Sequence, residues 1–366
     1  MKIIQIIDVR WYNASADFAV TQALALANRG HEILLMVNPG SPPADKAREK
    51  GLEVSEKIDF SKSNIFGSAG KLAEIAAKFK PDIVFAHRGE SHLVAAITSK
   101  RTGFKVARFR GDVRPPRRNI FSRILNEKLT KGIAVSTARL KQEYEKRYRL
   151  NGIPVRVIYP GIDSVRFEHG AKKEELKKEF GLNPAAPVIG MVGRLSPVKG
   201  HEYFLKASRR VFERFPGVQF VVAGGDAQLS AEQLKRNAAE MGLGNIVFLG
   251  EIENIDRLIS ALDIGVVAST GSEMICRVLM EYFAAGIPVV ATEINQVYEL
   301  MSISKGGIVV PPGNSDAMGD ALIDLLNDDI KSAELSKAGK SWARNDRSLE
   351  ALAMDSESFL ERVNNE

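Results

Sequence analysis

Short apolar runs alternate with longer amphipathic segments along almost the whole chain, and this alternation constrains the fold more than any other feature of the sequence. In the first half, six such runs predict strands: KIIQII, EILLMV, DIVFAH, KVARFR, GIAVS and VRVIY. The stretches between them predict helices at 17–29, 67–79, 91–101 and 137–148. Because strands that alternate with helices pair in parallel and are covered on both faces, the pattern predicts a doubly wound α/β fold.

The alternation is interrupted once, at the charged and turn-rich segment 168–187, and then restarts. The second half predicts strands at VIGMVG, VQFVVAGG, NIVFLG, IGVVAS, IPVVAT and GIVVPP, and helices near 201–215, 230–241, 255–261, 277–285, 315–326 and 330–343. Since 366 residues exceed what one core usually supports, we predict two Rossmann-like domains, 1–167 and 168–345, facing each other across a cleft. A last helix at about 346–366 is predicted to pack back on the first domain.

The single cysteine, Cys276, excludes an intrachain disulfide and a cysteine-based metal site, which fits a reducing compartment. No apolar stretch approaches the roughly 20 residues that span a bilayer, and the N-terminus has no long apolar signal region. The sequence also contains no Asp-x-Asp metal motif. We therefore expect a cytoplasmic protein without a metal or other cofactor.

Positive charge is concentrated in residues 101–150, which hold fifteen Lys and Arg residues against four acidic ones, whereas the whole chain has a net charge of only +6. Such a region attracts an anionic partner, either a phosphorylated acceptor, an acidic lipid surface or nucleic acid. Nucleic acid is disfavoured because no aromatic-interleaved basic strand accompanies the charge. A simple solvated basic face is the alternative interpretation.

One loop has the composition of a phosphate-binding site. In GMVGRLSPVKGHEYFLKA (190–207), a strand ends before Gly193, and Arg194 and Lys199 precede a helix that begins near His201. Two cations and free backbone N–H groups at a strand end suit a diphosphate. The alternative is an ordinary βα loop, since Gly and Pro punctuate many such loops.

Two glutamates eight positions apart mark a second loop and helix. Glu273 lies in the loop after a predicted strand, and Glu281 lies one turn inside the next helix. Carboxylates at these places can accept hydrogen bonds from sugar and ribose hydroxyls, and the backbone N–H groups of Met274 to Val278 can hold phosphate oxygens. The alternative is a capping carboxylate followed by one solvated glutamate.

Together these segments resemble the retaining glycosyltransferases of family 4, which have the two-domain GT-B architecture. GRLSPVKG resembles that family's diphosphate loop, and Glu273 to Glu281 matches its Glu-x7-Glu signature. Further matches extend over nearly the whole chain: RGHEILLMV, VIYPGIDSVRF, VVAGG, VFLGEI and GIVVPPGN. The combination is highly specific in the C-terminal half and weaker in the N-terminal half.

The resemblance implies a transferase that retains the anomeric configuration of a nucleotide-diphosphate sugar and needs no metal. Arg194 and Lys199 would stabilise the leaving diphosphate, Glu273 would hold donor-sugar hydroxyls, and Glu281 would hold the ribose. Further residues are expected to contact the donor: Gly193, Met274, Ile275, Cys276, Arg277, Val278, Gly250 and Ile252.

The first half departs from the family pattern where the acceptor is expected. WYNASADF (11–18) replaces the usual Gly-Gly-Ala-Glu loop, and Arg110 stands where many members carry a histidine. We predict that Asp112 orients an acceptor hydroxyl. The other expected acceptor contacts are Asn13, Ser15, His87, Arg110 and Arg114.

The basic region belongs to the half that binds the acceptor in this architecture. We therefore expect an anionic glycolipid or saccharide acceptor, as in lipopolysaccharide or other cell-surface polysaccharide or glycolipid synthesis, and peripheral contact with the inner membrane surface through Arg114, Arg117, Arg118 and Arg123. Two alternatives remain open: a sugar-nucleotide epimerase of the same architecture, and a non-catalytic nucleotide-sugar-binding protein.

Overall fold

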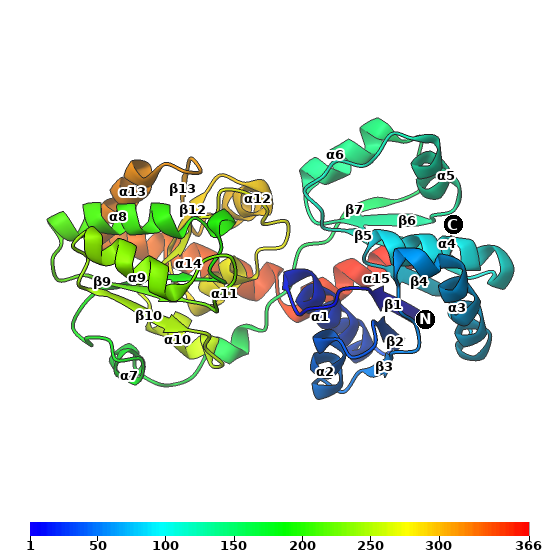
Figure 1. Cartoon of the computed structure of the whole chain (residues 1–366), viewed down its shortest axis with the longest axis horizontal. Coiled ribbons are helices and arrows are strands. Elements are labelled where there is room, and N and C mark those ends of the chain that lie inside the picture. The colour runs from blue at the N-terminus through cyan, green and yellow to red at the C-terminus, as the bar shows by residue number, and fades with distance from the viewer. Residues whose placement is uncertain (366) are drawn as a thin grey trace. The chain divides into compact units, whose positions relative to one another are not determined.

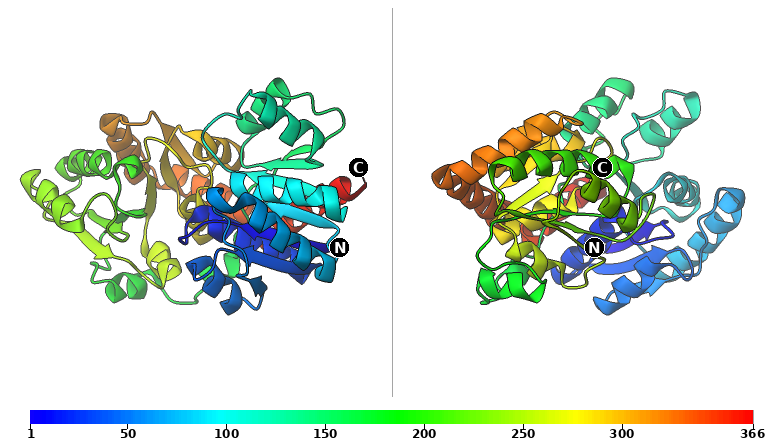
Figure 2. Two further views of the ribbon diagram at one scale, coloured as in Figure 1. Left: turned by 45° about the vertical axis from the view of Figure 1, so that its right-hand side comes forward. Right: turned by 60° about the vertical axis from the view of Figure 1, so that its left-hand side comes forward.

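The computed structural model describes residues 1–365, apart from the side chain of residue 62. The chain forms two compact units (Figure 1). Unit 1 comprises Met1–Gly161 and the segment from Leu349 onward, and unit 2 comprises Ile162–Ser348. In both units, helices cover the two faces of a parallel sheet (Figure 2).

Unit 1 contains a seven-stranded sheet with the order β3-β2-β1-β4-β5-β6-β7. Its strands are β1 (Lys2–Ile7), β2 (Glu32–Val37), β3 (Glu53–Ser55), β4 (Ile83–Ala86), β5 (Lys105–Arg110), β6 (Gly132–Val135) and β7 (Val155–Val157). Its helices are α1 (Ala14–Asn28), α2 (Pro42–Glu49), α3 (Ile65–Phe79), α4 (Gly89–Thr102), α5 (Ile120–Lys128), α6 (Ala138–Arg147) and α15 (Leu349–Asn365), with a short 3-10 helix at Lys62–Asn64. The strand order reverses between β1 and β4, which makes that point the topological switch of the sheet.

Unit 2 contains a six-stranded sheet with the order β10-β9-β8-β11-β12-β13. Its strands are β8 (Val188–Val192), β9 (Gln219–Ala223), β10 (Ile246–Gly250), β11 (Ile264–Val267), β12 (Val289–Thr292) and β13 (Gly307–Val310). Its helices are α7 (Lys173–Glu179), α8 (His201–Arg214), α9 (Ala231–Glu240), α10 (Ile255–Ala261), α11 (Arg277–Ala285), α12 (Asn295–Ser304), α13 (Ser315–Asn327) and α14 (Asp329–Asp346), with 3-10 turns at Ser164–Phe167 and Pro197–Lys199. Here the order reverses between β8 and β11.

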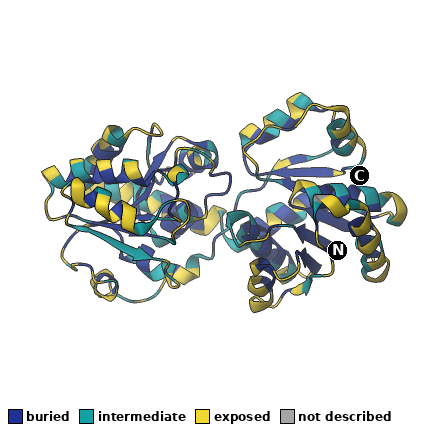
Figure 3. Cartoon of the chain, in the orientation of Figure 1, coloured by how far each residue is buried: buried dark blue, intermediate teal, exposed yellow. Residues whose placement is uncertain are grey.

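The apolar runs found in the sequence form the centre of each unit. The central strands of each sheet are mostly buried, whereas the edge strands β3, β10 and β13 are largely half-buried and the helices expose their outer faces (Figure 3). In unit 1, α3 and α4 pack on one face of the sheet with residues such as Ile6, Val84 and Val106, and α1 packs against α15. Burial on both faces explains why these strands read as continuous apolar runs.

The units divide at 161/162, six residues before the sequence boundary of 167/168, and the second unit extends to Ser348. The difference arises because segment 162–187 packs on unit 2 and is not a free linker. It contains α7, whose Lys177 pairs with Asp263 at 2.8 Å, while Glu179 pairs with Arg257 at 2.5 Å. The final helix α15 belongs to unit 1.

Several short elements were not predicted, namely β3, α2, α5, α7 and α12. The predicted class, two doubly wound α/β domains, is nevertheless confirmed by the two parallel sheets. Among the described residues, no helix is both long and apolar enough to cross a membrane.

Candidate functional site

The two segments singled out in the second half of the sequence meet at the switch point of unit 2. Strands β8 and β11 are neighbours in the sheet, so the loop 193–200 after β8 and the loop 268–276 after β11 leave the same carboxyl edge. Open α/β sheets bind ligands at such an edge.

Gly200 allows these two loops to approach each other closely. Its φ is +78°, and a Cβ atom there would lie 2.0 Å from the carbonyl oxygen of Ala268. A side chain at this position is therefore excluded both by the left-handed backbone and by the contact. The backbone N–H of Thr270 also donates to the carbonyl of Val198 at 2.9 Å.

Lys199 and Glu273 form an ion pair across the two loops. The Glu273 side chain is only 5% exposed, and the Lys199 side chain is 23% exposed. The hydroxyl of Ser269 donates to the same carboxylate oxygen at 2.7 Å. Since a buried carboxylate without partners would be costly, the lysine and the serine stabilise Glu273 and fix it in one orientation.

The backbone that carries Glu273 is held in an unfavourable conformation. Ser272 and Glu273 have φ values of +64° and +50°, which non-glycine residues rarely adopt. Two contacts hold this turn: the N–H of Gln296 donates to the carbonyl of Glu273 at 3.2 Å, and the Asn295 side chain donates to the carbonyl of Ser272. Strain maintained by surrounding bonds is typical of ligand-binding turns.

Arg194, the second predicted diphosphate cation, lies on the exposed side of the same loop. It follows Gly193, whose carbonyl oxygen would be 2.0 Å from a Cβ atom on Gly224, so the ends of β8 and β9 are also tightly packed. The structure thus brings Arg194, Lys199 and Glu273 to one edge, as the sequence predicted for a common site, while their roles remain predictions.

Glu281 lies on α11, one turn from the helix start. Its side chain is 4% exposed, and its Oε1 is 3.3 Å from Nε of Arg277, which is itself 46% exposed. The arginine therefore pairs with the carboxylate from the solvent side. A ribose that binds Glu281 must share this carboxylate with Arg277 or displace the guanidinium.

The loop between the two glutamates is less open than the sequence suggests. Met274, Ile275 and Cys276 are all buried, and Val278 is half-buried. The N–H of Cys276 donates to Oε1 of Gln296 at 2.9 Å, so this one of the expected phosphate donors already has a partner. Burial, followed by the Glu273 charge, raises the pKa of the Cys276 thiol well above its usual range, which rules out an activated nucleophile.

Two further predicted donor contacts lie at the end of β10. Gly250 has a φ of +67°, and its carbonyl accepts from the N–H of Gly224 at 2.6 Å. Ile252 follows in the next loop and is half-buried. Both leave the carboxyl edge of the unit 2 sheet.

His201 begins α8 directly behind the phosphate-loop candidate. It is 1% exposed, and burial lowers the pKa of its imidazole to about 4. The ring is therefore neutral at pH 7 and contributes no charge to the loop.

Unit 1 gathers charged residues at its own switch point. Asp8 follows β1, Arg88 follows β4, and Arg108 and Arg110 lie at the end of β5. Burial raises the pKa of Asp8, whose carboxylate accepts from the Ser91 hydroxyl at 2.9 Å. Asp8 and Arg108 were not predicted as site residues. The sequence feature that could have indicated Arg108 is an arginine inside the buried strand KVARFR.

Arg110 mainly organises the loop that follows β5. Its Nη2 donates to the carbonyl of Arg114 at 2.6 Å, and its guanidinium lies over the ring of Tyr144 at 5.8 Å. Asp112 accepts from the N–H of Arg114 at 3.0 Å and remains 52% exposed. The Asp112 carboxylate is thus accessible to a hydroxyl, as its predicted role requires.

The placement of His87 contradicts its predicted contact with an acceptor. The ring packs against Phe18, Phe85 and Phe109, and burial lowers its pKa to about 3. Its Nε2 lies 3.0 Å from the side-chain nitrogen of Gln5. The strand-end position suggested access to ligand, but the alternation of the strand directs this side chain into an aromatic cluster instead.

Asn13 and Ser15 lie at the start of α1. The Asn13 side chain caps this helix by accepting from the N–H groups of Ser15 and Ala16, both at 3.0 Å. Asn13 thus has a structural role, and its predicted acceptor contact stays a prediction, as does that of Ser15.

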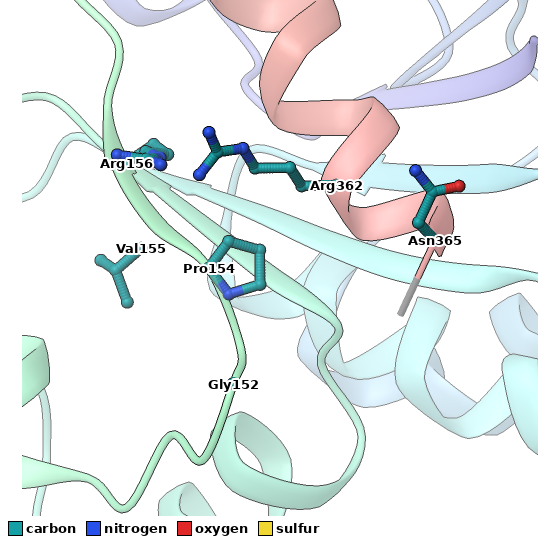
Figure 4. Close-up of a pocket in the computed structure, with 6 residues that line it drawn as sticks. All are labelled: Gly152, Pro154, Val155, Arg156, Arg362 and Asn365. Carbon is teal, nitrogen blue, oxygen red and sulfur yellow. The ribbon is translucent and has the colours of Figure 1, made fainter.

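Two surface pockets of unit 1 lie at the opposite edge of its sheet. One, beside the start of β7 and the end of α15, is lined by Gly152, Pro154, Val155, Arg156, Arg362 and Asn365 (Figure 4). The other adjoins the starts of β4 and β5. Both are at amino-terminal strand ends, where α/β sheets seldom bind substrates, so we assign neither to the reaction. Within residues 1–365, no three His, Cys, Asp or Glu side chains cluster as metal ligands.

Known proteins resemble both units. Residues 172–342 match the family model described as Glycosyl transferases group 1, and residues 16–166 match Glycosyltransferase Family 4. The solved structure of HepE from Anabaena in complex with UDP superposes with a TM-score of 0.87 at 19% identity, covering 99% of this chain and 100% of that one. The fold is the GT-B fold of glycosyltransferases.

Curated GT-B relatives are similar over part of their length. A D-inositol 3-phosphate glycosyltransferase of Corynebacterium urealyticum is 30% identical over 60% of this chain. The lipopolysaccharide core biosynthesis mannosyltransferase LpsB of Rhizobium meliloti is 33% identical over 51% of it. The chain spans about half the length of these relatives, 55% in each case.

Proposed function

We propose that this GT-B protein is a retaining glycosyltransferase that moves a sugar from a nucleotide-diphosphate sugar to an anionic glycolipid or saccharide acceptor without a metal ion. The observation that carries the proposal is the contact between Lys199 and the strained, buried Glu273 at the switch point of unit 2. This contact supports the proposal because a cation and a carboxylate that can accept hydrogen bonds from hydroxyls lie together where α/β sheets bind ligands.

In the proposed reaction, the bond between the anomeric carbon and the diphosphate oxygen breaks, and the electron pair leaves with the diphosphate. Lys199 and Arg194 stabilise that negative charge. The acceptor hydroxyl attacks from the face that the diphosphate vacates, which retains the configuration, and its proton passes to a donor phosphate oxygen. Glu273 holds donor-sugar hydroxyls through the carboxylate oxygen that Lys199 leaves free.

Glu281 is proposed to bind the ribose hydroxyls. Its pairing with Arg277 implies a small rearrangement on donor binding, in which the exposed guanidinium turns toward the diphosphate and the carboxylate becomes available. Charge-assisted hydrogen bonds that two vicinal hydroxyls donate to the carboxylate offset the lost ion pair.

Charge and relatives support an anionic acceptor. The basic region 101–150 lies entirely in unit 1, and the names of two relatives refer to an inositol 3-phosphate and to the lipopolysaccharide core. Synthesis of lipopolysaccharide, another surface polysaccharide or a glycolipid would use such acceptors.

Helix α5 supports peripheral contact with an anionic membrane surface. Three of its apolar side chains, Ile120, Phe121 and Ile124, are 71%, 55% and 46% exposed, and Arg117 and Arg118 precede the helix. Exposed apolar residues beside arginines suit an interfacial helix. Co-sedimentation with phosphatidylglycerol vesicles should weaken as salt rises, because exposed arginines are screened; binding insensitive to salt would contradict this contact.

The deciding experiment is a thermal-shift screen against nucleoside diphosphates and nucleotide sugars, with and without a chelator. A ligand at about 100 times its Kd adds roughly 2.7 kcal/mol to the native state. We expect stabilisation by one diphosphate family, unchanged by chelator and lost in Glu281→Ala. Glu240→Ala, an exposed glutamate on α9, is the matched control.

Transfer itself is then measured by mass analysis with candidate acceptors. An isomerised nucleotide sugar formed from donor alone would identify an epimerase. Donor binding without transfer to any acceptor would favour a non-catalytic binding protein, and the absence of any nucleotide response would refute the proposal.

A further inference from the structure

The carboxyl edge of the unit 1 sheet presents one row of charged residues on a single face. The register aligns Ile6 with Ala86 and Ala86 with Arg108 on β1, β4 and β5. Because side chains alternate along a strand, the positions two residues further on, Asp8, Arg88 and Arg110, share that face. The backbone thus brings three arginines and one aspartate together at the switch point of the sheet.

Arg108 is buried in this row without a partner for its charge. The residue is 8% exposed, and among the described residues its Nη1 has no hydrogen-bond acceptor. Among the same described residues, no Asp or Glu side chain forms an ion pair with Arg108. Burial lowers the pKa of the guanidinium to about 10, so it stays charged at pH 7. An unpaired buried guanidinium is costly, and an anion that bound to it would offset this cost.

The charges nearest Arg108 do not neutralise it. Arg110 and Arg88 add positive charge and oppose its ionisation, and Asp8 is the carboxylate that favours it. That carboxylate is beyond ion-pair distance of the guanidinium and already accepts from Ser91. Asp112 lies 4.0 Å from Arg110. Three cations beside two carboxylates therefore leave an excess of one positive charge, which an anionic phosphate group would balance.

We propose that Arg108, together with Arg88 and Arg110, binds a phosphate group carried by the acceptor. This inference rests on the proposed glycosyltransferase function and narrows its acceptor to a phosphorylated molecule. Arg88 is exposed and Arg108 is buried, so the phosphate is bound below the surface. A flat bilayer cannot reach the buried Arg108. Phosphate binding at this site is therefore distinct from membrane contact by α5.

The test uses the full chain, saturated with the nucleoside diphosphate that stabilises it most, so that the phosphate-binding loop of unit 2 is already occupied. Inorganic phosphate is then titrated against potassium acetate at equal ionic strength, and the thermal midpoint is followed. The variants are Arg108→Met, Arg88→Met and the control Arg139→Met, which removes an exposed arginine from α6 of the same unit.

Phosphate should raise the midpoint of the wild type and of Arg139→Met more than acetate does. In Arg108→Met the apparent phosphate affinity should fall about ten- to a hundredfold, as expected for loss of charge-assisted hydrogen bonds. Without phosphate, the midpoint of Arg108→Met should equal or exceed that of the wild type, because a buried unpaired charge has been removed. A residue that only supported the fold would lower it.

Three results would overturn the inference: an unchanged phosphate response in Arg108→Met, an equal response to acetate, or loss of the response only in the control. If Arg108→Met does not fold, Arg88→Met decides, since this exposed residue tolerates substitution and should still weaken phosphate binding. Vesicle co-sedimentation should be the same for Arg108→Met and the wild type. Absence of stabilisation by any nucleotide would instead refute the proposed function. The failure of the phosphate-site inference and the failure of the proposed function are therefore distinguishable.

Discussion

The two sheets end in switch points of similar topology that treat their charges in opposite ways. In unit 2, Lys199 and Glu273 neutralise each other and Ser269 completes the carboxylate's hydrogen bonds. In unit 1, Arg108 is buried and has no such partner among the residues that the structure describes. The same position in an α/β sheet therefore supports either a site that is internally paired before its ligand binds or one that is left charged.

The difference has a physical consequence for binding. A ligand that enters unit 2 exchanges contacts that already exist, as with Glu281 and Arg277. A phosphate that enters unit 1 would relieve an uncompensated charge and thus gain stability for that unit. The predictions below test this contrast, beginning with the largest effect.

Removing the cation of the paired site should have the largest effect. Lys199→Met is expected to lower kcat/KM for sugar transfer by about 10²–10³, the usual effect of losing one stabiliser of transition-state charge. Steady-state kinetics would show it, with the exposed Lys206→Met on α8 as the matched control. Equal kinetics for both variants would mean that Lys199 only neutralises Glu273.

The close approach of the two loops in unit 2 should be sensitive to one methyl group. Gly200→Ala is expected to destabilise unit 2 by about 2–4 kcal/mol, because a left-handed alanine is strained and its Cβ atom meets the Ala268 carbonyl. Gly30→Ala in unit 1 has a similar φ of +84° but open space around it, and should cost about 1 kcal/mol. Denaturant unfolding measures both, and equal losses would show that the contact is unimportant.

Buried neutral histidines should make the stability of each unit depend on pH: His87 and His92 in unit 1, and His201 in unit 2. The folded pKa values are about 3 for His87 and about 4 for His201, both below the unfolded value of about 6.5. Their stabilising contribution is therefore complete above pH 6.5 and is lost as pH falls, by about 2 kcal/mol each between pH 7 and 5. The raised pKa of Asp8 acts in the opposite direction in unit 1.

The loss of unfolding free energy between pH 7 and pH 5 is measured by denaturant unfolding at both pH values. His201→Gln should reduce the acid-induced loss of stability in unit 2, and His87→Gln should do so in unit 1. A variant with the same pH dependence as the wild type would show that its histidine does not titrate between the two states.

The sequence was sufficient for the sheets because their strands are buried on both faces and read as uninterrupted apolar runs. It also located Lys199, Glu273 and Glu281, because family motifs fix their spacing. Short elements such as β3 and α7 were missed, since a strand of three residues with one apolar side chain, or a charged heptad, carries little periodicity. Strand alternation places the side chains of His87 and Arg108 on opposite faces of the sheet. The sequence of one strand does not show which face of the sheet is aromatic and which is charged.

The partners of the site residues could not be predicted because they depend on distant segments or on the local backbone conformation. Gln296 holds the N–H of Cys276 from twenty residues away, and Ser269 reaches Glu273 only because of the left-handed turn. Neither contact leaves a pattern in the sequence. The place of Arg108 in the charged row depends on the register of three strands and on its burial, and neither can be read from the sequence.

Helix α15 has a consequence for how the protein is made. It completes unit 1 after all of unit 2 has been synthesised, with Phe359, Leu360 and Val363 almost fully buried and Ser356 bonded to Gln22. A nascent unit 1 must therefore emerge from the ribosome with an apolar surface uncovered, while unit 2, continuous in sequence, can fold first. Chaperone dependence during translation is thus expected to arise from the N-terminal half, although its strands are made earliest.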